Sequence, residues 1–388
     1  MRPYHQQIIV FAALALINAG FALGATPALF KHNPYLRIKA QPRTVIASFP
    51  VSLRLNLVNP SSLPLYFLPD VPVEDFVAAP SSRGPDGVLH LSRYGQSEIG
   101  RLRSATANPV VAYLFVKPRR SVKLHACFPF SRVYDLTMPG RYTFSLTTQE
   151  PLYFVSRKTT LYLRSGPATI GRHLLLAGFG DYVPDGSVAQ AIARSNSCVV
   201  TVTAPYGTSP PSAIEPAPKR SLPGPLPPTA RLVAKAIPAK GGGMPVLLRV
   251  WLYTGANPLS VSLTGNPLVD FRPTKVDGPD GRQGYGLVKT PKPHDGLLPN
   301  WKPVPLTAYG TWLTKHAPAK KLRAKTYVLK PHMVYQYTVP VNLSCRFDMT
   351  LPGNWGGSYH VRLQLAHSKL RTAWISVHVP PPADHLQP

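Results

Sequence analysis

Apolar and polar residues alternate with a period of two in short segments along most of the chain. Leu53, Leu55 and Leu57 are separated by single polar residues, and residues 142–146 and 359–365 repeat this pattern. A period of two is typical of β-strands that bury one face. β-branched and aromatic residues dominate the segments, and Gly-Pro-Asp-Gly or Pro-Gly turns separate them. The pattern predicts an all-β protein with little helix.

The strand pattern occurs twice. Pro-Val-Ser-Leu-Arg-Leu-Asn-Leu at 50–57 corresponds to Pro-Val-Leu-Leu-Arg-Val-Trp-Leu at 245–252, and Asp-Leu-Thr-Met-Pro-Gly at 135–140 corresponds to Asp-Met-Thr-Leu-Pro-Gly at 348–353. Shorter matches between these blocks keep the same order. Repeated blocks in one order predict two copies of one domain. Short strands joined by turns are typical of sandwiches, so we expect two tandem antiparallel β-sandwiches.

The matches set the expected boundaries of the two copies. The first copy covers residues 35–204 and carries an insertion at about 150–194, where residues 188–193 are expected to form a short helix. The second copy covers residues 229–380 and carries an insertion at about 285–328. Insertions between framework strands are common places for function.

Proline is unusually abundant, with 46 residues, and it works against long helices. Nine of these prolines lie between the copies, at residues 205–228. A segment of this composition predicts an extended, semi-rigid linker. The alternative is a loop that packs on a domain face.

The charge balance is strongly basic. Lys and Arg total 43 against 16 Asp and Glu, which gives a formal net charge of +27. Such a charge attracts polyanions, although a basic surface could instead only suit an anionic environment. The scarcity of carboxylates also limits the residues available for acid–base chemistry.

The N-terminus resembles an export signal. Arg2 and His5 precede an apolar run at 8–23, and small residues at 22 and 24 fit a cleavage site. We expect residues 1–25 to be a signal peptide and the mature protein to be periplasmic or secreted, without a transmembrane span. Export argues against nucleic acid as a partner.

The chain has three cysteines, Cys127, Cys198 and Cys345, whose spacing matches no zinc motif. Cys127 and Cys198 lie in the same copy and could be bridged or free. Cys345 has no partner in its own copy and is expected to be free.

The sequence predicts no enzyme, no cofactor and no metal site. Residues 95–100 contain one residue too many for a Gly-x-Ser-x-Gly elbow, and His-Glu-x-x-His does not occur. His360, His367 and His378 lie near one another in sequence, but histidines on edge strands that face water are the better explanation for them.

The end of each copy has a distinctive sequence. In the first copy, Asp135 precedes a Pro-Gly turn and Tyr142 enters a strand, as in the tyrosine corner of immunoglobulin-like sandwiches. The second copy keeps Asp348 and the Pro-Gly turn but has five residues, rather than one, between that turn and Tyr359. This sequence resembles immunoglobulin-like domains of bacterial exported proteins. It is similar to the β-domain that precedes the catalytic domain of deuterolysin-type metallopeptidases, and to small β-sandwich proteinase inhibitors. The resemblance implies an immunoglobulin-like fold and carries over no catalytic residue.

The second insertion combines cations with aromatic residues, a combination that suits sugar or phosphate surfaces. The candidate polyanion-binding residues are Lys315, Lys320, Lys321, Arg323, Lys325, Trp301 and Trp312. We therefore predict a non-catalytic binding or structural protein whose partner is an anionic envelope polymer or another exported protein. A solvated basic loop without a partner would have the same composition. The alternative function is a proteinase inhibitor that presents a protruding loop.

Overall fold

The structure is a computed structural model of the chain. The regions it describes are residues 33–67, 76–96, 111–124, 128–149, 152–155, 169–170, 173–176, 187–206, 212–218, 228–238, 244–278, 302–316, 324–350 and 357–379. The predicted signal peptide, residues 1–25, lies outside them.

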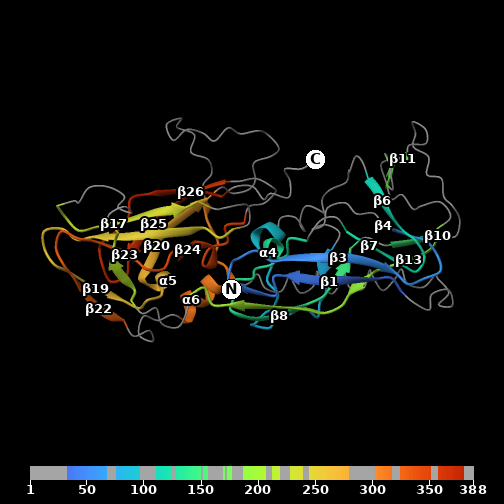
Figure 1. Cartoon of the computed structure of the whole chain (residues 1–388), viewed down its shortest axis with the longest axis horizontal. Helices are drawn as coiled ribbons and strands as arrows, with labels where there is room; N and C mark the ends of the chain where they lie inside the picture. Colours follow the sequence, from blue (N-terminus) through green and yellow to red (C-terminus); the bar gives the residue numbers. More distant parts are fainter. Residues whose placement is uncertain are drawn as a thin grey trace, which may run out of the picture.

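The described part of the molecule is mostly β-structure, as the alternating pattern predicts. The first copy and the second copy lie end to end and form an elongated molecule (Figure 1). Within the described residues, no helix is long and apolar enough to cross a membrane.

The first copy contains a six-stranded sheet in the order β5-β9-β14-β1-β3-β7. β1 and β3 pair antiparallel over their whole length, so Leu36 and Leu57 face the core together. β14 pairs parallel to β1. The strands are β1 (Tyr35–Gln41), β3 (Ser52–Asn59), β5 (Phe76–Ala78), β7 (Arg120–Lys123), β9 (Leu146–Thr148) and β14 (Arg194–Ser195).

Two further sheets complete the first copy. One has the order β11-β12-β6-β4-β10-β13 and the other the order β2-β15-β8. Their strands are β2 (Thr44–Ile46), β4 (Leu65–Phe67), β6 (Val111–Val116), β8 (Gly140–Phe144), β10 (Leu152–Val155), β11 (Thr169–Ile170), β12 (His173–Leu176), β13 (Ser187–Ala191) and β15 (Cys198–Thr203). A short helix, α4 (Phe130–Val133), packs beside β3.

The second copy has the sheet order β16-β23-β18-β17, with β24 also paired to β18, and a second sheet in the order β21-β20-β25-β26. β19 and β22 form a separate antiparallel pair. The strands are β16 (Ile214–Pro216), β17 (Arg231–Ile237), β18 (Leu247–Tyr253), β19 (Leu259–Leu263), β20 (Phe271–Gly278), β21 (Lys302–Pro303), β22 (Lys325–Leu329), β23 (Val334–Tyr337), β24 (Val341–Asn342), β25 (Gly357–Leu365) and β26 (Ile375–Val379). The helices are α5 (Pro267–Asp270), α6 (Ala308–His316) and the 3₁₀ helix η3 (Leu343–Cys345).

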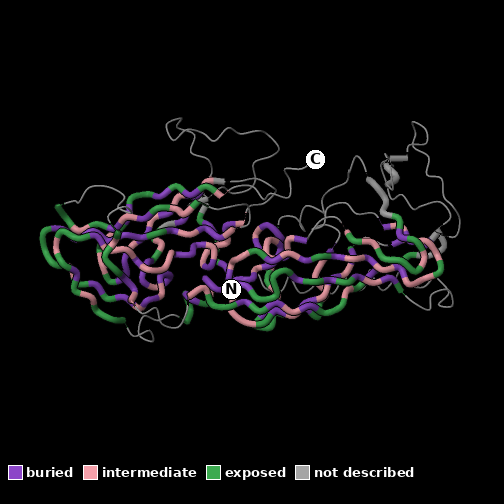
Figure 2. Tube along the Cα trace, in the orientation of Figure 1, coloured by how far each residue is buried: buried purple, intermediate pink, exposed green. Residues whose placement is uncertain are grey.

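Buried residues alternate with exposed ones along the strands and line the inside of both copies (Figure 2). In the first copy, Phe130 and Phe144 stack with ring centroids 3.9 Å apart. In the second copy, Tyr359 and Leu363 of β25 are fully buried. The buried residues of both copies form one connected cluster, so the apolar core continues from one copy into the other.

The tyrosine corner expected in the first copy is present, because the Tyr142 hydroxyl donates to the Met138 carbonyl at 3.0 Å. The extra residues before Tyr359 do not remove the equivalent bond. The Tyr359 hydroxyl donates to the Met349 carbonyl at 2.8 Å. In the aligned blocks, Met349 lies two residues before the position that corresponds to Met138. The corner is thus retained with a shifted acceptor.

The helix expected at 188–193 is a wrong prediction. Residues 187–191 form strand β13, which pairs antiparallel with β10. The apolar pattern of so short a segment fits either element, and the pairing available on β10 decides the outcome.

Part of the Pro-rich segment is not a free spacer. Residues 214–216 form β16, which pairs with β23 of the second copy, and Ala213 is buried. The Tyr206 hydroxyl donates to the Pro340 carbonyl at 3.1 Å and accepts from the Asn342 N–H at 2.6 Å. These contacts agree with the alternative of a segment that packs on a domain face.

Cys198 and Cys345 are both buried and free, so the expected free thiol at Cys345 is confirmed. Cys127 lies outside the described residues.

Candidate functional site

The two copies are joined by a reciprocal set of hydrogen bonds. The Asp135 carboxylate of the first copy accepts from the Ala308 N–H at 2.7 Å, at the first turn of α6. In return, the Asp348 carboxylate of the second copy accepts from the Arg93 N–H at 2.5 Å, at the first residue of a helical turn at 93–96. A carboxylate is favourable at the start of a helix because the first N–H groups there lack partners within the helix.

Each aspartate is oriented by the threonine that lies two residues later. The other oxygen of Asp135 accepts from both the N–H of Thr137, at 3.0 Å, and its hydroxyl, at 2.5 Å. Thr350 makes the same two bonds to Asp348. The threonine hydroxyls also cross the interface, because Thr137 accepts from Tyr309 N–H and Thr350 accepts from Tyr94 N–H. The corresponding blocks of the two copies therefore form an approximately two-fold interface.

The segments that receive these caps also match one another, which the sequence comparison missed. Ser-Arg-Tyr-Gly at 92–95 corresponds to Thr-Ala-Tyr-Gly at 307–310. Both glycines are required by space, since a Cβ at Gly95 would lie 2.2 Å from the Val133 carbonyl oxygen and one at Gly310 would lie 2.1 Å from that of Arg346. The expected insertion at 285–328 thus contains a segment with a counterpart in the first copy. The match was missed because it has only two identical residues.

Burial sets the electrostatics at this interface. It raises the pKa of the Asp348 carboxyl above the usual range, and the negative charge of Asp135 acts in the same direction. Hydrogen bonds from Thr350 and Arg93 favour the ionised form but only partly offset the burial. Ionisation of the Asp348 carboxyl is therefore less favourable than that of a carboxyl in water.

A cavity of about 520 Å³ opens beside this interface, within the size range of small-ligand sites. Both copies contribute to its wall, and α6 supplies one side. The polar and aromatic residues that line it are Asp86, His90, Arg93, Gln96, Asp135, Thr307, Thr311, Trp312, Lys315, His316 and Asp348.

The acids of this wall already have partners. Asp135 and Asp348 hold the interface, as described, and Asp86 lies 2.6 Å from His90. Burial opposes ionisation of Asp86, but the hydrogen bonds from His90 and from backbone N–H groups, together with the charge of His90, outweigh it and lower the pKa of that carboxyl. Arg93 and Lys315 are the Arg and Lys residues that line the cavity.

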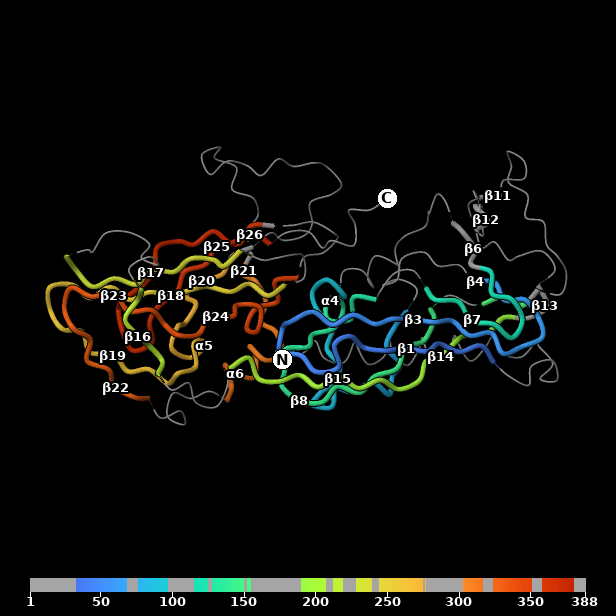
Figure 3. Tube along the Cα trace, viewed as in Figure 1, coloured from blue at the N-terminus to red at the C-terminus, as the bar shows by residue number. Residues whose placement is uncertain are grey.

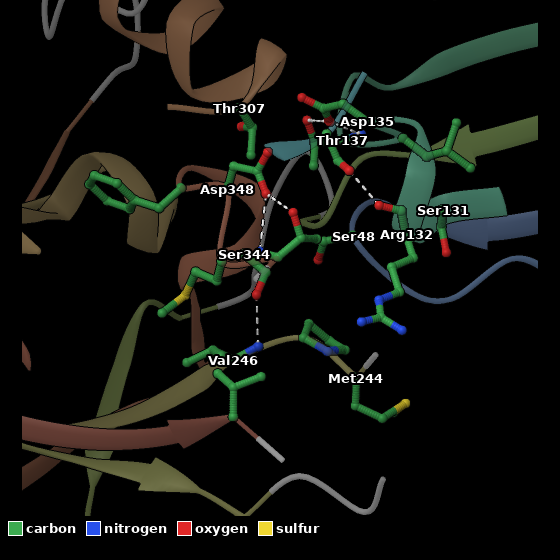
Figure 4. Close-up of a pocket in the computed structure, with 17 residues that line it drawn as sticks. Ser48, Ser131, Arg132, Asp135, Thr137, Met244, Val246, Thr307, Ser344 and Asp348 are labelled. Atoms are coloured by element: carbon green, nitrogen blue, oxygen red, sulfur yellow. Dashed lines mark hydrogen bonds between the residues drawn. The ribbon is translucent and has the colours of Figure 1, made fainter. Parts of the chain in front are cut away.

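A smaller cavity of about 120 Å³ shares Asp135, Thr307 and Asp348 with the larger one. Figure 4 shows its wall, to which Ser48 and Arg132 of the first copy and Asp348 of the second copy contribute. This cavity, like the larger one, is lined by residues of both copies.

Of the predicted site residues, Trp312, Lys315 and Lys325 are in the described part of the chain. Trp312 and Lys315 lie on α6 at the cavity, so the loop expected there is a helix. Lys325 is exposed at the start of β22, with its Nζ 5.4 Å from the centroid of the Tyr327 ring. Lys320, Lys321, Arg323 and Trp301 lie outside the described residues.

Trp312 belongs to a stack of three rings along α6. Its ring lies 5.8 Å from that of Tyr309, one turn before it, and 5.4 Å from that of His316, one turn after it. The side chain is 41% exposed and not part of the core. Contacts with both neighbouring rings restrict the rotamers of Trp312, which lowers the entropy cost of any contact it makes.

The described residues contain no group of three or more His, Cys, Asp or Glu side chains that could hold a metal ion. The Cys345 thiol is a poor nucleophile, because burial raises its pKa to about 12.

No family model matches the chain, and no curated protein matches it. A solved structure named BspA_C_mut is 8% identical over 90% of this chain and 100% of its own, with a TM-score of 0.15. The N-terminal domain of the Streptococcus gordonii adhesin Sgo0707 is 8% identical over 92% of this chain and 90% of its own, with a TM-score of 0.13. With TM-scores this low, neither structure gives information about the function of this chain. The resemblance to the deuterolysin-type β-domain stays a prediction.

Proposed function

We propose that this chain is a non-catalytic exported binding protein whose partner is an anionic envelope or extracellular polymer. The observation that supports it is the cavity at α6, which combines Lys315, Arg93 and Trp312 at the junction of the two copies. The wall also contains Asp86, Asp135 and Asp348, each of which is already hydrogen-bonded within the protein, so Lys315 and Arg93 are the groups of the wall that would attract an anion.

The cationic segment of the second insertion continues the chain directly from this helix. Lys320, Lys321 and Arg323 follow α6, and Lys325 begins the next strand. A polymer has many charges, so it can contact the cavity with one unit and the following cations with others. Multiple weak contacts of this kind add their affinities when their spacing permits simultaneous binding.

The finer fold that we propose is a pair of immunoglobulin-like sandwiches. The recurrence of the tyrosine bond and of the Asp-x-Thr caps in both copies supports it. Such an arrangement places the cavity on a rigid junction rather than on a loop.

The test measures binding of fluorescein-labelled polyphosphate by fluorescence anisotropy at several NaCl concentrations. Changing Lys320, Lys321, Arg323 and Lys325 to Ser should weaken binding. The slope of the logarithm of the binding constant against the logarithm of the NaCl concentration should also become less negative by about one for each lost contact. Trp312→Ala should weaken binding at every salt concentration without changing that slope, because it removes no charge.

A matched variant removes four exposed cations elsewhere, Arg43, Arg141, Lys330 and Lys369. The control is needed because any loss of charge from a protein with a formal charge of +27 reduces nonspecific attraction. Equal effects of the two quadruple variants would show diffuse electrostatics and would overturn the proposed site.

A further inference from the structure

A separate surface of the first copy concentrates positive charge without any acid. The strands β14, β1, β3 and β7 are neighbours in the six-stranded sheet, and β1, β3 and β7 lie side by side in Figure 1. Alternate residues of β1 and β3 pack into the core, and the others face outward. The exposed cations on the outward side of these strands are Arg37, Lys39, Arg54, Lys123 and Arg194, whereas Arg120 of β7 is exposed but pairs with the buried Asn59. We call this set the cationic sheet face.

The strand register brings the side chains of this face together. Lys39 lies directly opposite Arg54, and Arg37 lies opposite Asn56, which is in turn opposite Lys123. Successive rows are two residues apart, about 7 Å, and neighbouring strands are about 4.8 Å apart. None of the six strands of this sheet contains Asp or Glu. The charges are therefore not neutralised within the sheet.

The pair of Lys39 and Arg54 recurs in the second copy. There, Lys235 of β17 lies directly opposite Arg249 of β18, and both are exposed. Like charges directly opposite each other destabilise an antiparallel pair. The repulsive pair is present at the same place in both copies. An anion bound between the two cations would relieve their repulsion.

We propose that the cationic sheet face binds a phosphate-bearing polymer. Arginine presents a planar fork that matches two phosphate oxygens, and lysine adds a compact charge, so a paired Lys and Arg suit one phosphate group between them. Arg37 is already oriented, because its guanidinium donates to the Tyr35 hydroxyl at 2.9 Å. The rows of cations along the strands suit a ligand with repeated charges. This surface is separate from the α6 cavity, and the proposal holds whether or not that cavity binds the same polymer.

The experiment uses the full chain and the variant Lys39→Ser/Arg54→Ser. Its affinity for labelled polyphosphate should fall about tenfold at moderate salt. The slope of the logarithm of the binding constant against the logarithm of the salt concentration should become less negative by about two. Its melting temperature without ligand should be unchanged or higher, since the repulsion is relieved. A residue pair with a merely structural role would give a lower melting temperature and the original salt dependence.

The control variant Arg141→Ser/Lys369→Ser removes one Arg and one Lys outside this face. An equal loss of affinity in this control would overturn the proposal. Poly-glutamate provides a second arm, because it carries carboxylates in place of phosphates. Equal affinity for poly-glutamate and polyphosphate, lost equally in the sheet-face variant, would overturn the assignment to phosphate. If the sheet-face variant weakens binding but Trp312→Ala and the Lys320/Lys321/Arg323/Lys325 variant do not, the proposed binding at the α6 cavity is wrong and the proposal for the cationic sheet face stands.

Discussion

The caps between the two copies make Asp348 the most informative position for a stability test. In Asp348→Ala, the backbone N–H groups of Arg93 and Thr350 lose the acceptor that they have at 2.5 and 3.1 Å. A buried donor without a partner costs roughly 1–3 kcal/mol. Removing a carboxylate whose pKa is raised by burial returns part of this cost. We expect a net loss of roughly 2–4 kcal/mol in the free energy of unfolding.

Equilibrium unfolding in urea, followed by tryptophan fluorescence, measures this loss. The matched variant is Asp86→Ala, which removes the acid of an exposed pair with His90 and should cost at most about 1 kcal/mol. Asp135→Ala should behave like Asp348→Ala, because Asp135 makes the corresponding bonds. If Asp348→Ala is no more destabilising than Asp86→Ala, the caps do not hold the copies together.

The pH dependence gives a further check. Because the pKa of Asp348 is raised in the folded protein, the folded state binds a proton more readily than the unfolded state between the two pKa values. Lowering the pH through the folded pKa towards the unfolded one therefore stabilises the wild type through this group. The Asp348→Ala variant lacks the effect, so the difference in stability should grow as the pH falls. A difference that shrinks would contradict the assignment of the raised pKa.

Two other predictions concern the same interface. Gly310→Ala should destabilise the protein much more than Gly87→Ala, because its Cβ would lie 2.1 Å from the Arg346 carbonyl oxygen, whereas Gly87 has open space and only a positive φ of 86° to accommodate; the comparison of unfolding midpoints in urea decides this, and equal shifts would contradict it. Cys345 should not react with iodoacetamide in the native protein at pH 8 but should react after denaturation, because its thiol is buried and its pKa is raised to about 12; mass spectrometry of native and denatured samples measures the modification, and rapid native labelling would refute the buried placement.

The strands were predictable because their signal is local. Leu53, Leu55 and Leu57 alternate with polar residues, and β3 buries those three side chains as the pattern predicts. A strand exposes alternate residues to two different environments, so its sequence carries the period directly. Where the apolar pattern was short, as at 188–193, it could not separate helix from strand. The pairing of β13 with β10 then decided the outcome.

The candidate site was predictable only in part. The combination of Trp312 and Lys315 was found from composition, but their placement on α6 at the cavity was not. Arg93, which shares that cavity, lies more than two hundred positions earlier in the sequence. No local pattern relates such residues, because the cavity exists only when the two copies are docked.

The sequence by itself determined the all-β character of the chain, its strong positive charge and the repeated blocks that identify Asp135 and Asp348 as equivalent. Only the tertiary structure decided what these residues do. Asp135 caps a segment 173 positions away, and Asp348 caps one 255 positions away. Likewise, Lys39 and Arg54 become a repulsive pair only through the register of β1 and β3. Periodicity records which side of an element faces the core, whereas the partner across an interface or a ladder depends on how distant segments meet.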